Sequence, residues 1–246
     1  MRNIKLTIEY DGTDYCGWQA QNGTRARSIQ RVIEQALTKV FQKKISLIGS
    51  GRTDSGVHAS NQTANFKTDS HLPLTRIRSA LNSYLPQDIV IKKAEQVDED
   101  FHARFGAKSK VYRYSVLNAP VPSPFNRRYS LFAPYPLDIE KMKKAATYLQ
   151  GRHNVRSFHR ARGKQKNFVR TIKKLKITRK NEFIFFEIEA EGFLYHMVRI
   201  IVGTLLEVGR GRFGPGYLKE ILKGKNRKLA GPTVPSRGLC LMRVKY

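Results

Sequence analysis

The order of strand-like and helix-like segments is the strongest constraint on what this chain can fold into. Ile4, Leu6, Ile8 and Tyr10 alternate with polar residues, as on a strand with one buried face. Ser28 then precedes apolar residues at helical spacing, which predicts a capped amphipathic helix. The elements expected after it are strands at 45–50 and 61–67, a helix at 75–83 and a strand at 89–97. The first half therefore has the order βαββαβ.

The second half repeats this order of elements. The expected elements are a strand around 112–116, a helix from 139 to 149, strands at 170–179 and 183–190, a helix at 196–208 and a strand at 239–244. We therefore expect an α+β fold of two ferredoxin-like, RRM-like units. The units would form an extended, mainly antiparallel sheet with helices on one side and an active-site cleft between them. The expected domains are 1–105 and 106–246, divided after the acidic run that ends at Asp100.

The charge of the chain narrows the choice of partner. Lys and Arg number 46 against 19 Asp and Glu, a formal net charge of +27. Self-repulsion of this size usually accompanies a polyanionic partner, and an ordinary charged surface is the alternative. The segment from Arg156 to Lys180 holds eleven Lys or Arg and no acid. It predicts a phosphate-binding loop followed by a strand with a basic outer face.

Several classes of protein fit the sequence poorly. No apolar run approaches the ~18 residues of a spanning helix, and the chain starts in a strand pattern rather than a signal peptide. Cys16 and Cys240 are isolated, which predicts no disulfide framework and a reducing compartment, the cytoplasm. His and Cys do not fall at metal-ligand spacing, so we expect neither a zinc site nor another metal site.

An unexpected acid lies in the segment from Gly51 to His58. Asp54 is flanked by two glycines and by Arg52 in a turn between two apolar strands. A bare Asp before Gly is usually a turn residue or helix cap. The convergence of a carboxylate, a guanidinium and an imidazole favours a reactive site on a rigid scaffold instead.

Two further positions are candidates for chemistry. Arg199 lies in the apolar opening of a predicted helix, where a buried guanidinium needs a carboxylate or carbonyl groups around it. The alternative is that its side chain reaches the surface. Tyr112 and Tyr114 share one face of a basic strand, where they either stack on bases or pack in the core.

Motifs spread over almost the entire chain resemble the TruA family of tRNA pseudouridine synthases. The matching segments are Tyr10–Thr13, Gly17–Gln19, Gly51–Ala59, Phe101–Phe105, Tyr112–Tyr114, Val169–Ile172, Phe193–Gly203, Ala230–Thr233 and Gly238–Leu239. Each segment is weak by itself, but their number and order make the resemblance specific. Three positions depart from the family pattern: Ser55 where Ala is usual, Asn154 where Asp is common and Val155 where an aromatic residue is usual.

The resemblance implies a role for each matching site residue. Asp54 would be the nucleophile that isomerises uridine to pseudouridine without a cofactor, and Arg199 would pair with it. Tyr112 would stack on the target base, and Leu239 would line the base pocket. Arg52 would fill the space left by the flipped nucleotide, which offsets part of the lost stacking.

The resemblance also implies a partner. The substrate would be the anticodon stem-loop of tRNA at positions 38, 39 and 40, and the enzyme would be a homodimer with each tRNA contacting both subunits. Our candidates for contact with the RNA backbone are Lys164, Lys166, Arg170, Lys219, Lys223, Lys225, Arg227 and Lys228.

Two other classes of function remain as alternatives. A non-catalytic RNA-binding module or chaperone explains the charge but leaves Asp54 and Arg199 without a role. A carboxylate hydrolase acting on a nucleoside or sugar usually needs a second carboxylic acid within about 5–10 Å. The segments around Asp54 offer no obvious second acid.

Overall fold

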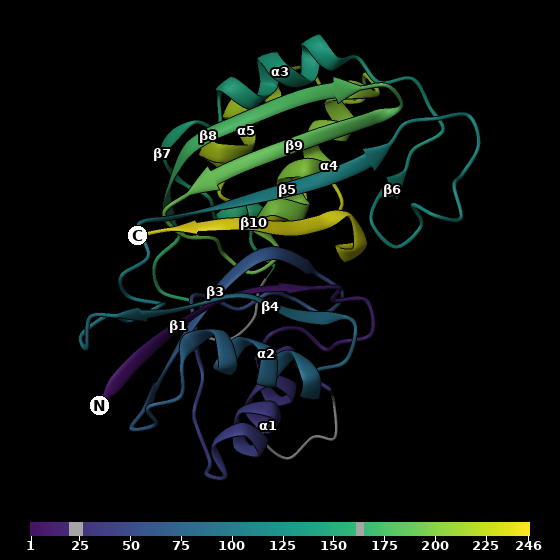
Figure 1. Ribbon diagram of the computed structural model, residues 1–246. Coiled ribbons are helices and arrows are strands. Elements are labelled where there is room, and N and C mark those ends of the chain that lie inside the picture. Colours follow the sequence, from purple (N-terminus) through teal and green to yellow (C-terminus); the bar gives the residue numbers. More distant parts are fainter. Residues whose placement is uncertain (20–26, 161–164) are drawn as a thin grey trace. The chain divides into compact units, whose positions relative to one another are not determined.

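The computed structural model describes residues 1–19, 27–160 and 165–246 (Figure 1). Its contacts divide the chain into two compact units. Unit 1 comprises Met1–Lys108 and Cys240–Tyr246, and unit 2 comprises Ser109–Leu239. In the described residues the fold is α+β and the strands pair mostly antiparallel, as the sequence predicts. No helix in this described part is long and apolar enough to cross a membrane.

Unit 1 is built on a small sheet with β1 and β3 at its centre. Its elements are β1 (Arg2–Tyr10), α1 (Ile29–Phe41), β2 (Ile48–Gly49), β3 (His58–Thr68), α2 (Leu74–Tyr84), β4 (Ile89–Val97) and β10 (Leu239–Lys245). β1 pairs antiparallel with β3 and β4, and β2 pairs antiparallel with β3. β10 pairs with β3 in parallel, with Cys240 opposite His58. This order places the start of β3, and the loop before it, beside the C-terminal strand.

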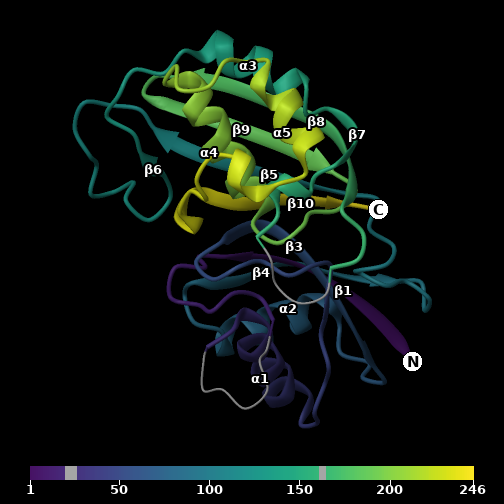
Figure 2. The same cartoon turned by 180° about the vertical axis from the view of Figure 1, so that it is seen from behind.

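The two faces of this sheet have different chemistry. Ile4, Leu6 and Ile8 of β1 are fully buried on the face covered by α1 and α2, which lie together on that side in both views (Figures 1 and 2). The Ser28 hydroxyl accepts a hydrogen bond from the Arg31 backbone N–H, so the predicted cap of α1 is confirmed. On the opposite face, Asn3 of β1 is buried although it is polar.

A buried amide pair and a bond to the C-terminal strand hold residues 101–108 on unit 1. The Asn65 side-chain amide donates to the Asn3 side-chain oxygen at 2.9 Å, and the Asn3 amide donates to the Phe101 carbonyl at 2.8 Å. The Ala103 backbone N–H donates to Asn65 at 2.9 Å. These bonds satisfy buried polar groups that would otherwise be costly. They fix residues 101–103 to unit 1. The Lys108 N–H also donates to the Lys245 carbonyl of β10 at 2.8 Å, so unit 1 extends to residue 108 rather than 105.

The strand predicted at 45–50 is mostly wrong, because only Ile48–Gly49 pair as β2. The backbone of Leu47 is bonded to α1 instead of to a strand. Its N–H donates to the Glu34 carboxylate at 2.9 Å, and its carbonyl accepts from the Gln30 side chain at 3.0 Å. Side chains of a helix therefore replace the ladder that the apolar pattern predicted.

Unit 2 has more elements than the repeat predicted. They are β5 (Ser109–Leu117), β6 (Leu131–Phe132), α3 (Ile139–Thr147), β7 (Gly151–Asn154), β8 (Val169–Lys180), β9 (Phe183–Ala190), α4 (Met197–Gly209) and α5 (Tyr217–Gly224), with 3-10 turns at Arg156–Phe158, Arg227–Leu229 and Ser236–Gly238. The strands follow the order β5-β9-β8-β7 with antiparallel neighbours, and β6 pairs in parallel with β5. The strand predicted to close unit 2 is β10, whose contacts place Cys240–Tyr246 in unit 1.

Helix α4 is the central element of the unit 2 core. All of its residues are buried except Arg199, which is half-buried. Figure 2 shows α4 and α5 in front of β5, β9 and β8, on one face of the sheet. The segment 231–234 packs directly on α4: the Gly231 N–H donates to the Thr204 hydroxyl at 2.9 Å. A Cβ added at Gly203 would lie 1.9 Å from the Pro232 carbonyl oxygen.

We expect Gly203→Ala to lower the free energy of unfolding by about 2 kcal/mol or more, because the new methyl group meets backbone that cannot move aside. Gly209→Ala on the same helix is the matched control, since its Cβ would meet the Met142 and Leu137 side chains, which can shift. Urea unfolding of both variants measures the difference. Equal stability of the two would show that α4 does not depend on this close contact.

Candidate active site

Asp54 lies in the loop between β2 and β3, and the residue before it is held rigidly. Thr53 is buried, and its hydroxyl lies 2.8 Å from the Tyr10 hydroxyl at the end of β1. The Thr53 carbonyl accepts a hydrogen bond from the Trp18 N–H at 3.1 Å. Asp54 itself is half-buried, and Arg52 is exposed.

The residues after Asp54 are fixed in the same way. The Val57 N–H donates to the Asp54 carbonyl at 3.2 Å, which closes a turn. The Tyr15 carbonyl accepts from the Gly56 N–H at 3.2 Å and from the Ser55 hydroxyl at 3.1 Å. The position of the Asp54 backbone is therefore set by bonds on both sides of it.

Two glycines allow residues 11–18 to lie directly against this loop. A Cβ at Gly17 would lie 2.4 Å from the Thr53 carbonyl oxygen, and one at Gly12 would lie 2.0 Å from that of Val57. The Gly17 φ of +104° also belongs to a region that other residues rarely adopt. Both glycines belong to the motif that runs from Tyr10 to Gln19. This motif is thus the direct support of the Asp54 loop.

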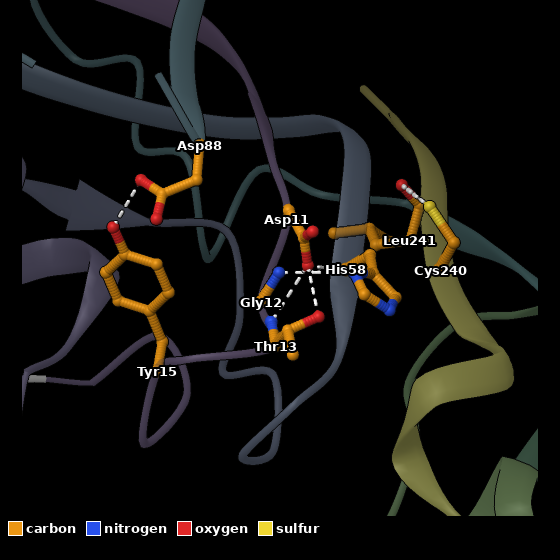
Figure 3. Close-up of polar contacts among 8 residues, drawn as sticks. All are labelled: Asp11, Gly12, Thr13, Tyr15, His58, Asp88, Cys240 and Leu241. Atoms are coloured by element: carbon orange, nitrogen blue, oxygen red, sulfur yellow. Dashed lines mark hydrogen bonds and ion pairs between the residues drawn. The ribbon is translucent and has the colours of Figure 1, made fainter. Parts of the chain in front are cut away.

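His58 ends the loop and pairs with Asp11 (Figure 3). Its Nδ1 lies 3.0 Å from the Asp11 carboxylate and 3.2 Å from the Gly12 backbone N–H. One nitrogen cannot donate to the first and accept from the second at once. We assign the proton to Nδ1, because its charge-assisted bond to the Asp11 carboxylate is stronger than a bond from the Gly12 N–H. An Nδ1 without a proton would instead place its lone pair against the lone pairs of the carboxylate.

Asp11 and Tyr15 anchor the supporting segment. The Asp11 carboxylate also accepts from the Thr13 N–H at 2.9 Å and from the Thr13 hydroxyl at 2.5 Å. The Tyr15 hydroxyl donates to Asp88 at 2.5 Å (Figure 3). Burial is the larger cause, and this hydrogen bond the smaller one, that raises the pKa of Tyr15 above its usual value. Sequence reasoning gave neither Asp11 nor Asp88 a role. The available signal for Asp11 was its place before Gly12, which is typical of a turn.

Arg52 is bonded within unit 1. Its Nε donates to the Gln19 side-chain oxygen at 2.7 Å, and this contact is exposed. Arg52 and Asp54 thus share one short loop, with the guanidinium toward solvent and the carboxylate half-covered.

In unit 2, the predicted stacking tyrosine is largely buried. Tyr112 of β5 is 8 % exposed and contacts Phe193 edge-on, with ring centroids 5.0 Å apart. Its neighbour on the same face, Tyr114, is fully buried and donates to the Pro235 carbonyl at 2.8 Å. Burial raises the pKa of Tyr114 above its usual range. Tyr114 is therefore a core residue, and Tyr112 keeps a small exposed fraction.

Arg199 is held by the backbone of the segment that packs on α4. Its Nε donates to the Val234 carbonyl at 2.8 Å, so its side chain does not simply extend into solvent. Leu239 is buried, with 5 % exposure. Asp54 and Arg52 belong to unit 1, whereas Tyr112, Arg199 and Leu239 belong to unit 2. The pairing of Asp54 with Arg199 stays a prediction.

The predicted RNA-backbone residues fall into two groups. Lys166, Lys219, Lys223, Lys225 and Lys228 are exposed. Arg170 and Arg227 are half-buried and bond to nearby backbone carbonyls: Arg170 donates to Val169 at 2.6 Å, and Arg227 to Ala230 at 3.1 Å. Lys164 lies outside the described residues.

Comparison with known proteins identifies the family of the chain. A family profile described as "tRNA pseudouridine synthase" matches residues 6–106 and 145–246. "tRNA pseudouridine synthase A 2" of Clostridium perfringens is 49% identical over 246 residues, 100% of both chains. "tRNA pseudouridine synthase A" of Thermoanaerobacter sp. is 47% identical over the same length, again 100% of both chains.

The solved structures that match are far more distant. Cbf5 in a complex with Nop10 and Gar1 aligns with a TM-score of 0.39 and 11% identity, over 96% of this chain and 57% of that one. This likeness is too weak to support an argument. The family profile and the full-length relatives establish the family without it. The chain belongs to the tRNA pseudouridine synthases, which isomerise uridine in tRNA to pseudouridine.

Proposed function

We propose that the chain converts uridine to pseudouridine at positions 38, 39 and 40 of the tRNA anticodon stem-loop, with Asp54 as the nucleophile and no cofactor. The observation that carries the proposal is the Asp54 loop. Its backbone is bonded on both sides, by Trp18 to Thr53 and by Tyr15 to Ser55 and Gly56. A carboxylate held in this way is positioned before the substrate arrives.

The balance of the reaction supports a mechanism without a redox cofactor. The bond between uracil N1 and ribose C1′ breaks, and a bond between uracil C5 and C1′ forms. The hydrogen on C5 is lost and N1 gains one, so substrate and product are isomers and no electrons are gained or lost overall. The protein has to supply a nucleophile, a path for one proton and a pocket in which the base turns.

Asp54 can enter this reaction at two points. Its carboxylate oxygen attacks C1′ and releases uracil as an anion, or it attacks C6 of the ring and weakens the bond to the sugar. In the first route the bond from Asp54 to C1′ breaks as C5 attacks C1′. In the second route the bond from Asp54 to C6 breaks after C5 is joined to C1′. Both routes need an ionised and oriented carboxylate.

The remaining site residues would serve the flipped nucleotide. Tyr112, which keeps a small exposed fraction beside Phe193, would stack on the base and help to move the C5 proton. Leu239 would line the pocket, and Arg199 would keep Asp54 ionised. The exposed Arg52 would occupy the gap in the RNA, since base flipping costs a few kcal/mol of lost stacking and pairing.

We also propose that tRNA binds to a homodimer and contacts the basic residues through its phosphates. The exposed Lys219, Lys223, Lys225 and Lys228 lie on or just after α5. Contacts of this kind bind many tRNA sequences alike and weaken with salt, because each one releases counterions.

We expect Asp54→Asn to lower the rate of pseudouridine formation by at least about 1,000-fold, since it removes the nucleophile. Unmodified tRNA transcripts, mapped by chemical modification and primer extension, measure the product at positions 38–40. Asp100→Asn, at an exposed acid of the same unit outside the segment that supports the loop, is the matched control.

Binding of tRNA should survive Asp54→Asn. An active Asp54→Asn variant would contradict the proposed nucleophile. Wild-type protein that binds tRNA but forms no product would favour the chaperone alternative.

We expect His58→Ala to lower kcat by about tenfold, because Nδ1 no longer holds the end of the loop against Asp11. His58→Asn should restore most of the rate, since its amide N–H can donate to the same carboxylate. Single-turnover rates and tRNA affinity, measured together, separate positioning from binding. A lower melting temperature with unchanged kcat would show that the pair only stabilises unit 1.

We expect the triple change of Lys219, Lys223 and Lys225 to Gln to weaken tRNA binding and to flatten its dependence on salt, by about 2 in the slope of log K against log salt. Lys141, Lys143 and Lys144 of α3 form the control set, because Lys141 and Lys143 are already paired with Asp138 and Glu140. Titrations of tRNA at several salt concentrations give both slopes. An unchanged slope would remove α5 from the interface.

A further inference from the structure

The loop between β5 and β6 exposes large apolar side chains. In Val121–Tyr129, Phe125 is 90% exposed, Val121 68% and Tyr129 50%. Single exposed apolar residues are ordinary, but three on one loop, one of them almost fully exposed, indicate a surface that meets a partner. In both views this loop extends away from the strands of unit 2 beside β6 (Figures 1 and 2).

The backbone of this loop is ordered. The Asn126 N–H donates to the Ser123 carbonyl at 3.2 Å, and its side-chain amide donates to the Ser123 hydroxyl at 3.0 Å. The Asn126 carbonyl in turn accepts from the N–H groups of Tyr129 and Ser130, both at 3.0 Å. Phe125 is therefore presented by a bonded turn, and little conformational entropy would be lost when its ring meets a partner.

The charge of the loop indicates what the partner is. Arg127 and Arg128 are exposed, and no acid occurs between Asn118 and Leu137. The Arg127 Nη1 donates to the Pro124 carbonyl at 3.1 Å, which keeps its charge on the turn that carries Phe125. Aromatic rings beside arginines suit exposed bases and phosphates. A second copy of the same patch would place like charges together.

We propose that the Val121–Tyr129 loop binds unpaired nucleotides of the tRNA substrate away from the reacting uridine. Phe125 stacks on a base, and Arg127 and Arg128 contact the adjoining phosphates. The loop is remote from the predicted base-stacking residue of this unit, since Tyr112 and Leu117, the last residue of β5, are about 17 Å apart along the strand. The proposal depends on tRNA being the substrate and not on the identity of the nucleophile.

Phe125→Ser tests the proposal. It should raise the Kd and KM for an unmodified tRNA transcript by about 5-fold to 150-fold, the range expected for one stacked base. The kcat at saturating tRNA should stay unchanged, and Phe125→Tyr should bind like the wild type. Val90→Ser is the control, because Val90 is an apolar side chain of unit 1 that is 43% exposed and has no aromatic ring. It should leave Kd unchanged.

Filter binding, tritium-release kinetics and analytical ultracentrifugation provide the measurements. A Kd for Phe125→Ser within about 2-fold of the wild type would overturn the proposal, as would an equal loss for Val90→Ser. A shift in oligomeric state that accounts for the lost affinity would also overturn it, since the loop would then join protein subunits. Asp54→Asn gives the opposite pattern, with lost turnover and retained binding, so the two proposals fail separately.

Discussion

The contact of two glycines with the Asp54 loop is the constraint on which the rest of the site depends. Gly12 and Gly17 bring residues 11–18 so close to residues 53–57 that a methyl group at either position would overlap a carbonyl oxygen. The closeness lets backbone N–H and C=O groups of the two segments bond directly. A loop would otherwise be among the least rigid parts of a small unit. Here the loop is held by hydrogen bonds on both sides of Asp54.

The network around this contact spreads outward to the sheet. Tyr15 links the loop to Asp88 before β4, through its carbonyl on one side and its hydroxyl on the other. Asp11 links the end of β1 to His58 at the start of β3. Three strands of unit 1 are thus connected to the loop by polar groups. In a chain with a net charge of +27, Asp11 and Asp88 thus hold the scaffold around the loop that carries Asp54.

The predictions that depended on local patterns succeeded where local forces decide the structure. The Ser28 cap, the apolar stripe of α1 and the alternation in β1 all appear as expected, since neighbours along the chain determine them. The strand at 45–50 failed because side chains of α1 took the backbone bonds of Leu47. The apolar pattern of residues 45–50 could not show that side chains of another element would take these backbone hydrogen bonds.

The sequence by itself determined the α+β class, the main helices and strands, the polyanionic partner and the identity of the motif that carries Asp54. These properties follow from composition, periodicity and the spacing of residue types. Only the tertiary structure decided that Asp11 pairs with His58, that Arg199 bonds to Val234 and that β10 pairs with β3. Each of these contacts joins residues far apart in the chain. Close packing and the need to satisfy buried polar groups select such partners only after the elements have come together.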